Sequence, residues 1–238
     1  MIHPLVAALE DKFQAVRNED WPLSKRLKTI ADEVRAKGPD FAAAVDNFVS
    51  RLEAAQAGEG TPKVGEPMPD FTMPDQDGQF ISLREILSRG PAVLAFHRGH
   101  WCPYCRLNMV GLAEIEADVA PAQIYAISAE LARYTRKIRA ESGAGFPFLT
   151  DLDAGYALSI NLAILVDETM AAMIAGAGWN IPAYQGGQAW IHPVPAVFIV
   201  DTDGIVRTRH VDPDYRRRME LDDVLAGVRS IGPASHGS

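Results

Sequence analysis

The chain has 238 residues, of which 47% are hydrophobic and 23% charged, with a net charge of −8 and a pI near 5.2. This is the composition of a soluble globular protein, and its acidity argues against nucleic acid or an anionic membrane as a standing partner. No run of 18 apolar residues indicates a membrane-spanning helix, and the first 20 residues lack the features of a signal peptide. We therefore expect a cytoplasmic protein. Neighbouring cysteines there usually serve redox chemistry or metal binding.

Residues 1–58 are predicted to form a helical N-terminal extension. Three stretches carry apolar residues at helical spacing: Leu5, Ala8, Leu9, Phe13 and Val16; Leu23, Leu27, Ile30, Ala31 and Val34; and Phe41, Val45, Phe48, Val49 and Leu52. A Gly- and Pro-containing linker follows at 58–62. The three helices could cap the rest of the chain or pair with a second subunit in a homodimer, and the pattern leaves both open.

Residues 62–232 are predicted to form a second domain of alternating strands and helices. The expected elements are a hairpin of 71–73 with 80–81, a short helix opened by a capping box at 82–85, a strand at 91–97, a helix at 103–118, a strand at 123–128, a helix at 131–143, a segment beginning at 146, a hairpin over 194–211 and a helix at 220–229. This alternation predicts an α/β sheet with helices on both faces.

The only two cysteines lie in the sequence Trp-Cys-Pro-Tyr-Cys, where a buried strand gives way to a helix. Free backbone N–H groups and the helix dipole stabilise a thiolate there, so we expect the pKa of Cys102 to lie below its usual value of about 8.5. Pro103 fits the first helical turn, where its missing N–H costs nothing. Cys105 lies one turn later and could attack a mixed disulfide or sulfenic acid on Cys102, a spacing that suits a dithiol–disulfide cycle.

Zinc binding is the main alternative to redox chemistry. His97, His100, Cys102 and Cys105 form an HxxHxCxxC run that could supply four zinc ligands. Against this, His97 ends a strand whose side chains alternate between faces, while the cysteines lie on a helix. Two cysteines that merely pack in the core are a further alternative. We expect no bound metal and no cofactor.

Three segments resemble a known family. VGEPMPDFTMPDQDGQFISLREI (64–86) resembles the opening of the alkyl hydroperoxide reductase/thiol-specific antioxidant (AhpC/TSA) family, the peroxiredoxins and their relatives. PAVLAFHRGHWCPYC is similar to that family's active-site strand and helix, and VPAVFIVDTDGIVR to its later hairpin. The resemblance covers residues 62–230, and the helical extension resembles that of a bacterial peroxiredoxin-like subgroup. It implies a thioredoxin-like fold, with a central mixed sheet flanked by helices, and a thiol-based peroxidase or reductase activity.

The chain departs from the family at its signature residues. Peroxiredoxins carry PxxxTxxC, and Arg98, Cys102 and Cys105 stand at the proline, threonine and peroxidatic cysteine positions. The family's second arginine falls on Pro195. The replacements resemble thioredoxin and glutaredoxin, which have a CxxC at this turn and a cis-proline opening a facing strand. That resemblance implies a cis bond before Pro195, although Pro193 and Pro195 could simply end a loop.

The two resemblances name different nucleophiles. Similarity to thioredoxin implies that Cys102 attacks and Cys105 resolves, whereas similarity to peroxiredoxins implies that Cys105 attacks. The position of Cys102 at the helix start favours the first assignment.

Several neighbours could support the cysteines. Arg98 could stabilise an anion, or it could be a surface charge. His97 and His100 could assist proton transfer, or each could bond only to the backbone. Trp101 is expected to pack at the lip of the site, and the run 216–218 of three arginines is interpreted as a solvated helix face.

Together these features predict a thiol-dependent peroxidase. It would reduce hydrogen peroxide or organic hydroperoxides through a Cys102–Cys105 cycle, and a thioredoxin-like protein or a low-molecular-weight thiol would then reduce the enzyme. Two alternatives stay open: a protein disulfide reductase without peroxidase activity, and a zinc-binding or interaction module on the same fold.

Overall fold

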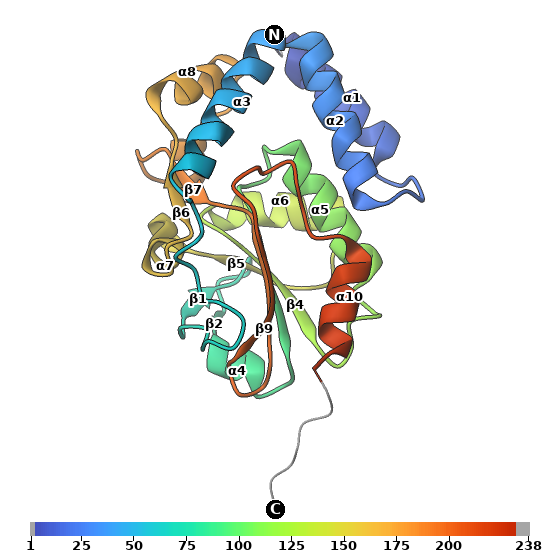
Figure 1. Cartoon of the computed structure of the whole chain (residues 1–238), viewed down its shortest axis with the longest axis vertical. Coiled ribbons are helices and arrows are strands. Elements are labelled where there is room, and N and C mark those ends of the chain that lie inside the picture. Colours follow the sequence, from blue (N-terminus) through green and yellow to red (C-terminus); the bar gives the residue numbers. More distant parts are fainter. Residues whose placement is uncertain (1–2, 232–238) are drawn as a thin grey trace, which may run out of the picture.

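The computed structural model describes residues 3–231, so the predicted domain limits at residues 1 and 232 lie outside the described range (Figure 1). The helices are α1 (Pro4–Val16), α2 (Leu23–Lys37), α3 (Pro39–Ala54), α4 (Leu83–Leu87), α5 (Pro103–Glu114), α6 (Ala132–Ser142), α7 (Gly155–Ser159), α8 (Glu168–Gly176), α9 (Ile181–Gln185) and α10 (Leu221–Arg229), with the 3₁₀ turn η1 (Leu152–Ala154). The strands are β1 (Thr72–Pro74), β2 (Phe80–Ser82), β3 (Ala92–Phe96), β4 (Gln123–Ser128), β5 (Phe148–Thr150), β6 (Ala163–Leu165), β7 (Ile191–Pro193), β8 (Ala196–Val200) and β9 (Val206–Val211).

The centre of the molecule is a five-stranded mixed sheet in the order β5-β4-β3-β8-β9. Strands β3, β4 and β5 are parallel, and β8 runs antiparallel to β3 and β9. Strand β3 is buried on both faces, as its uninterrupted apolar sequence predicts. Its last residue, Phe96, pairs with Ala196, the first residue of β8. The segment after β3 and the segment before β8 therefore lie side by side at the same end of the central strands.

The predicted elements of the sheet region are confirmed. Strand β4 has the predicted bounds, and β8 and β9 form the predicted hairpin. Helix α5 ends four residues before its predicted end because the chain turns there, with the Asp118 N–H donating to the Ile115 carbonyl. At α4, the Ser82 hydroxyl accepts the Glu85 N–H at 3.1 Å, whereas the Glu85 carboxylate pairs with Arg89, so only half of the predicted capping box forms.

Residues 152–193 lie between the sheet strands β5 and β8, and we call this segment the insertion. The sequence offered no prediction for it. Its two short strands, β6 and β7, pair antiparallel, with Ala163 opposite Pro193. Helices α8 and α9 lie between these strands in the chain. Helix α8 lies beside α3 at the top of the molecule in Figure 1, where Asp167 binds Arg51 at 2.6 Å.

The three predicted N-terminal helices are present, and we call α1–α3 the helical cap. Their apolar stripes are buried inside this same chain, in one hydrophobic cluster with Trp101, Cys102 and Cys105. The guanidinium group of Arg26 on α2 is buried and binds both carboxylate oxygens of Glu114 on α5 at 2.7 Å. The extension thus covers the first turn of α5 (Figure 1), as the first of the two interpretations expected, and the homodimer stays a prediction.

None of the helices in the described range is long and apolar enough to cross a bilayer.

Candidate active site

The cysteine pair lies at the junction between β3 and α5, as predicted. Cys102 is the N-cap residue of α5 and has an extended backbone, and Pro103 is the first helical residue. The connecting turn depends on Gly99, whose φ of +142° favours glycine. A Cβ atom there would lie 2.6 Å from the carboxylate of Glu130, so the turn has no room for a side chain.

Cys105 is held as the more acidic of the two thiols. Its sulfur accepts the Arg98 N–H at 3.3 Å and faces Nη2 of Arg218 at 3.5 Å. Burial opposes ionisation, but the hydrogen bond from Cys102 and the charge of Arg218 outweigh it. Together they hold the pKa of Cys105 well below its usual range. The negative charge of the pair therefore resides on Cys105.

The predicted ionisation and exposure of Cys102 are wrong. Burial raises the pKa of Cys102 well above its usual range, and the hydrogen bond that its thiol donates to Cys105 raises it further. Only 1% of Cys102 is exposed, because the helical cap covers the first turn of α5. Desolvation therefore outweighs the helix dipole at this position. The dithiol at rest has its proton on Cys102 and its charge on Cys105.

Arg98 lies beside Cys102 as a buried cation. Its guanidinium carbon is 3.8 Å from the centre of the Tyr215 ring and 4.7 Å from that of Trp101, so two aromatic rings flank the charge. Its Nε and Nη1 atoms have no hydrogen-bond partner within residues 3–231. The structure thus brings Arg98 and Trp101 to the cysteines, as predicted, and corrects the alternative of Arg98 as a surface charge.

A small cavity of about 20 Å³ lies against Cys102. Residues from the cap, the insertion and the sheet region line it: Leu9, Val34, Phe41, Arg98, Trp101, Cys102, Pro103, Tyr104, Trp179 and Tyr215. Cys105 is not among them and is fully buried. The cysteine that lines the cavity is therefore the one with the raised pKa.

A second hollow of about 340 Å³, which we call the outer hollow, adjoins the cavity. The two share four lining residues: Leu9, Trp101, Pro103 and Trp179. His100 lines this outer hollow, where its Nδ1 lies 2.7 Å from the buried carboxylate of Glu130 and its ring stacks on Tyr134. The outer hollow and the cavity beside Cys102 thus share one wall.

His97 and His100 lie in different surroundings. His97 is fully buried, and neither ring nitrogen has a hydrogen-bond partner in the described part of the chain. Burial lowers the pKa of His97 to about 4, so the ring is neutral near pH 7. His100 is instead fixed by Glu130. Within residues 3–231 no three metal-binding side chains come together, so the HxxHxCxxC run does not form the donor set that the zinc alternative requires.

The expected cis bond before Pro195 is wrong. In the described residues only the Ala120–Pro121 bond is cis. The chain reaches Pro195 in an extended path from β7, with the Val194 N–H donating to the Leu162 carbonyl at 2.8 Å. Continued by one residue, the β3–β8 register places Pro195 beside His97. Pro195 therefore borders the site without the thioredoxin-like bond.

Arg218 is the main functional residue that the sequence interpretation missed. Residues 212–218 form no helix, and Arg218 is buried with Nε donating to the Tyr215 carbonyl at 2.8 Å. The interpretation of 216–218 as a solvated helix face is therefore wrong. Pro213 between two aspartates was a signal for a turn.

His192 of β7 was also missed. Its Nδ1 bonds to the Pro193 carbonyl at 3.0 Å, which leaves Nε2 as the lone-pair nitrogen, and Nε2 has no partner in the described residues. Burial lowers the pKa of His192 to about 3. Its ring centre lies 6.3 Å from that of Trp101, so a second neutral imidazole borders the site.

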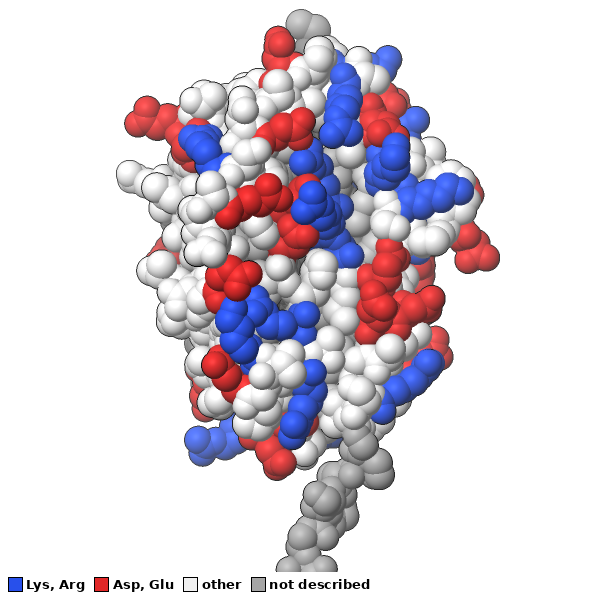
Figure 2. All heavy atoms as spheres, in the orientation of Figure 1, with Lys and Arg blue, Asp and Glu red and all other residues white. Residues whose placement is uncertain are grey.

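Two larger hollows have neither cysteine among their lining residues. One of about 390 Å³ between α2 and the 212–218 loop is lined by Lys28, Arg35, Asp214, Arg216, Arg217 and Arg218 among others. Figure 2 shows basic side chains running down the upper middle of this face beside acidic ones. Arg216 pairs with Asp214 at 2.7 Å and Arg217 with Glu53 at 3.5 Å, so acidic partners offset much of this charge.

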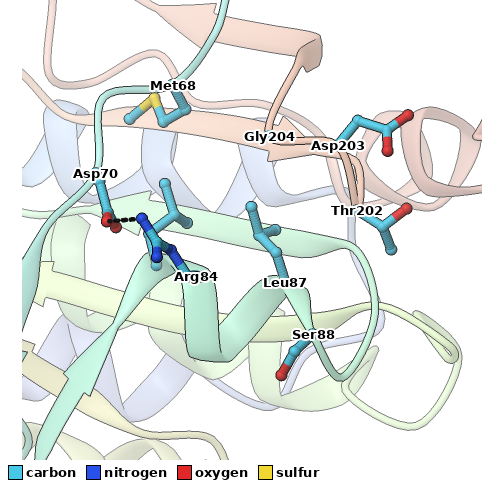
Figure 3. Close-up of a pocket in the computed structure, with 9 residues that line it drawn as sticks. Met68, Asp70, Arg84, Leu87, Ser88, Thr202, Asp203 and Gly204 are labelled. Atoms are coloured by element: carbon cyan, nitrogen blue, oxygen red, sulfur yellow. Dashed lines mark ion pairs between the residues drawn. The ribbon is translucent and has the colours of Figure 1, made fainter.

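The other hollow, of about 420 Å³, lies at the opposite end of the sheet, between α4 and the β8–β9 turn (Figure 3). Asp70 and Arg84 face each other there at 4.0 Å, while Met68 and Leu87 supply an apolar floor. No cysteine or histidine lines it. The redox chemistry therefore belongs to the cysteine end of the molecule.

Comparison with known proteins decides the family. The sequence profile of the AhpC/TSA family matches residues 64–209, which include both cysteines. The chain belongs to the AhpC/TSA family. It is therefore a thiol-dependent peroxidase or oxidoreductase. The match begins after the helical cap and ends before Arg218, so the site draws on residues from both sides of the matched range.

Solved structures show the same fold. Peroxidoxin BcpB from Mycobacterium tuberculosis is 23% identical with a TM-score of 0.55, over 71% of this chain and 98% of its own. Peroxiredoxin 6 of Arenicola marina is 16% identical with a TM-score of 0.55, over 70% and 71%. Enterococcus faecalis AhpC is 14% identical with a TM-score of 0.53, over 71% and 92%. This likeness establishes the thioredoxin-like fold of the AhpC/TSA domain. No curated protein sequence matches the chain.

Proposed function

We propose that this AhpC/TSA protein reduces hydrogen peroxide or organic hydroperoxides through a Cys102–Cys105 dithiol–disulfide cycle. The observation that carries the proposal is the arrangement of the two sulfurs. Cys102 lines a cavity beside a buried cation, and Cys105, one turn later, has a lowered pKa while that of Cys102 is raised. Transfer of the Cys102 proton to Cys105 would ionise the thiol of the residue that lines the cavity.

The first step oxidises Cys102. Its proton passes to Cys105, and the Cys102 thiolate attacks one peroxide oxygen. The O–O bond breaks, Cys102 becomes a sulfenic acid and the other oxygen leaves as hydroxide or alkoxide, to be protonated from solvent. The sulfur loses two electrons to the peroxide. Arg98 lines the cavity, where its charge would stabilise both the attacking thiolate and the departing oxygen.

The second step forms the disulfide. The Cys105 thiol attacks the sulfenic sulfur of Cys102, the S–O bond breaks, and the hydroxyl leaves as water with the Cys105 proton. A thioredoxin-like protein or a low-molecular-weight thiol then attacks the disulfide through a mixed disulfide and returns two electrons. A reducing cytoplasm, the proposed location, would keep both thiols ready for the next peroxide.

Single-cysteine variants test the assignment. We expect reduced Cys105→Ser to be oxidised by peroxide more slowly than wild-type protein, because the acceptor of the Cys102 proton is missing, but still faster than free cysteine. The product is a Cys102 sulfenic acid that traps a dimedone label and forms no internal disulfide. Cys102→Ser should react with peroxide no faster than free cysteine does. Stopped-flow rates and intact-protein mass spectrometry measure both. A wild-type rate equal to that of free cysteine would refute the peroxidase, and a fast Cys102→Ser with a slow Cys105→Ser would reverse the two roles.

The protein disulfide reductase alternative is less well supported by the same geometry. A protein disulfide must contact the attacking sulfur directly, and both sulfurs lie beneath side chains of the cap with at most 1% of either residue exposed. A small peroxide needs no such contact surface.

A further inference from the structure

We propose that the helical cap makes this enzyme selective for hydrogen peroxide over organic hydroperoxides, with Leu9 and Phe41 as the residues that set the limit. The inference rests on the proposed peroxidase function and specifies its substrate. It starts from the cavity beside Cys102, whose volume is about 20 Å³. One water needs about 10–15 Å³ of such space. The cavity therefore suits a ligand of one or two oxygen atoms and has no room for an alkyl group.

The polar groups of the cavity fit a small oxygen ligand. Arg98 lines the cavity, and Nε and Nη1 of its guanidinium group have no partner in the described residues. A small oxygen ligand beside this cation would accept a charge-assisted hydrogen bond from it. Both oxygens of hydrogen peroxide can accept such bonds. An alkyl hydroperoxide would have to place its carbon chain against the same charged wall or through the apolar one.

The apolar wall comes from outside the sheet. Leu9 of α1, Val34 of α2 and Phe41 of α3 close the cavity from the cap side, and all three precede the AhpC/TSA match at residue 64. The insertion adds Trp179, whose ring packs edge-on against Phe41 with centres 6.5 Å apart. Leu9 and Trp179 also line the outer hollow, so they separate it from the cavity. A bulky substituent that sits in the outer hollow must pass these side chains to bring its peroxide group to Cys102.

Leu9→Ala provides the direct test, with Phe41→Ala as a second variant. Oxidation of the reduced protein by hydrogen peroxide, tert-butyl hydroperoxide and cumene hydroperoxide is followed by intrinsic fluorescence in a stopped-flow instrument. We expect wild-type protein to prefer hydrogen peroxide over cumene hydroperoxide by about 100-fold or more. Each variant should reduce that ratio by about 10-fold or more, since a single missing methylene in an apolar pocket changes selectivity by about 10- to 200-fold.

Leu5→Ala is the matched control. Leu5 lies one turn before Leu9 on the same helix, both are buried at 3% and 4% exposure, and Leu5 lines neither hollow. Both variants lose a similar buried side chain, so denaturant unfolding should show a similar loss of stability. Only Leu9→Ala should change the peroxide ratio.

The outcomes distinguish a failure of the proposed size limit from a failure of the proposed peroxidase function. A wild-type enzyme that reduces both peroxides at similar rates overturns the size limit and leaves the peroxidase intact. Reaction with neither peroxide overturns the peroxidase itself. If Leu5→Ala relaxes the ratio as much as Leu9→Ala does, general loosening of the cap is responsible and the assignment to the wall is wrong.

Discussion

The five-stranded sheet and the helical cap reach the cysteines in different ways. The sheet and the adjoining turn contact sulfur with polar groups, since the Arg98 N–H at the end of β3 donates to Cys105. The cap contributes apolar side chains such as Leu9 and Phe41, and none of its polar atoms within the described residues bonds to either sulfur. Both reacting sulfurs thus lie within the family match, whereas most of the apolar wall beside Cys102 comes from a segment outside it. The cap could therefore vary in size without altering the reacting atoms.

The largest expected effect tests whether cap and sheet fold as one unit. Phe13 of α1 and Phe198 of β8 are both fully buried, one in each region. We expect Phe13→Ala and Phe198→Ala each to lower the free energy of unfolding by about 3–5 kcal/mol. Because the cap shares a hydrophobic cluster with α5, both variants should unfold in one transition in urea, followed by circular dichroism and fluorescence.

A separate transition of Phe13→Ala at low urea would show that the cap and the sheet do not unfold as one unit. It would mean that the cap opens while the sheet stays folded. In that case access to Cys102 would depend on the population of the open cap rather than on the wall residues alone.

Short-range patterns were sufficient to predict the sheet region, because β3, β4 and β8 are largely apolar runs and a turn sequence at 201–204 joins β8 to β9. The insertion escaped prediction because its strands are three residues long and two of its helices five, too short to show a period.

The electrostatics of the site depend on contacts that no local pattern contains. Arg218 reaches Cys105 across 113 residues of sequence. Likewise, the helix dipole predicted an acidic Cys102, but burial by the cap, which the sequence could not place, raises its pKa instead. The positions of the two thiols were predictable and their protonation was not.

A second prediction concerns His97, at the end of β3. Burial lowers its pKa to about 4, against about 6.5 in an unfolded chain. Between these values the unfolded state binds a proton that the folded state does not, so stability rises with pH and falls as pH drops from 6.5 towards 4. The shift corresponds to about 3 kcal/mol.

His97→Leu removes this site and breaks no hydrogen bond, because neither ring nitrogen has a partner within residues 3–231. Urea unfolding at pH 7, 6, 5 and 4.5 should show a shallower loss of stability in the variant than in wild-type protein. The carboxylates titrate in both proteins, so their contribution cancels in the difference. Identical slopes would show that His97 accepts its proton in the folded state at an ordinary pH.

A third prediction concerns Arg218, which lies outside the family match. Arg218→Met keeps much of the side-chain length and removes the charge beside Cys105. A hydrogen bond to a charged group is worth about 1.5–3 kcal/mol, so the pH at which the thiolate ultraviolet absorbance appears should move upward by about 1–2 pH units. An unchanged titration would show that Arg218 does not stabilise the charge on Cys105.

Arg217→Met is the control for this variant. Arg217 precedes Arg218 in the chain but is exposed and binds Glu53 and Asp212 at the surface, so its loss should leave the thiolate titration nearly unchanged. An upward shift with Arg217→Met equal to that of Arg218→Met would point to the positive charge of the 212–218 loop as a whole rather than to the contact with Cys105.

The smallest expected effect compares the N-cap residues of two helices, α4 beside the sheet and α8 in the insertion. The Ser82 hydroxyl caps α4 in the sheet region by accepting the Glu85 N–H at 3.1 Å, and the Asp167 carboxylate caps α8 by accepting the Met170 N–H at 3.1 Å. Replacing either with alanine should cost about 1 kcal/mol of unfolding free energy. Asp167 also binds Arg51 on α3, an exposed pair that adds little to stability but joins the insertion to the cap.

The two substitutions should therefore differ in their effect on peroxide selectivity although they cost similar free energies of unfolding. Asp167→Ala loosens α8 against α3 at one end of this helix pair, whose other end carries the contact between Phe41 and Trp179, and should speed the oxidation of cumene hydroperoxide relative to hydrogen peroxide. Ser82→Ala acts at the opposite end of the sheet and should leave that ratio unchanged. If both variants left the ratio unchanged, the wall beside Cys102 would not depend on the junction of α3 with α8, and the control of access would rest on α1 alone.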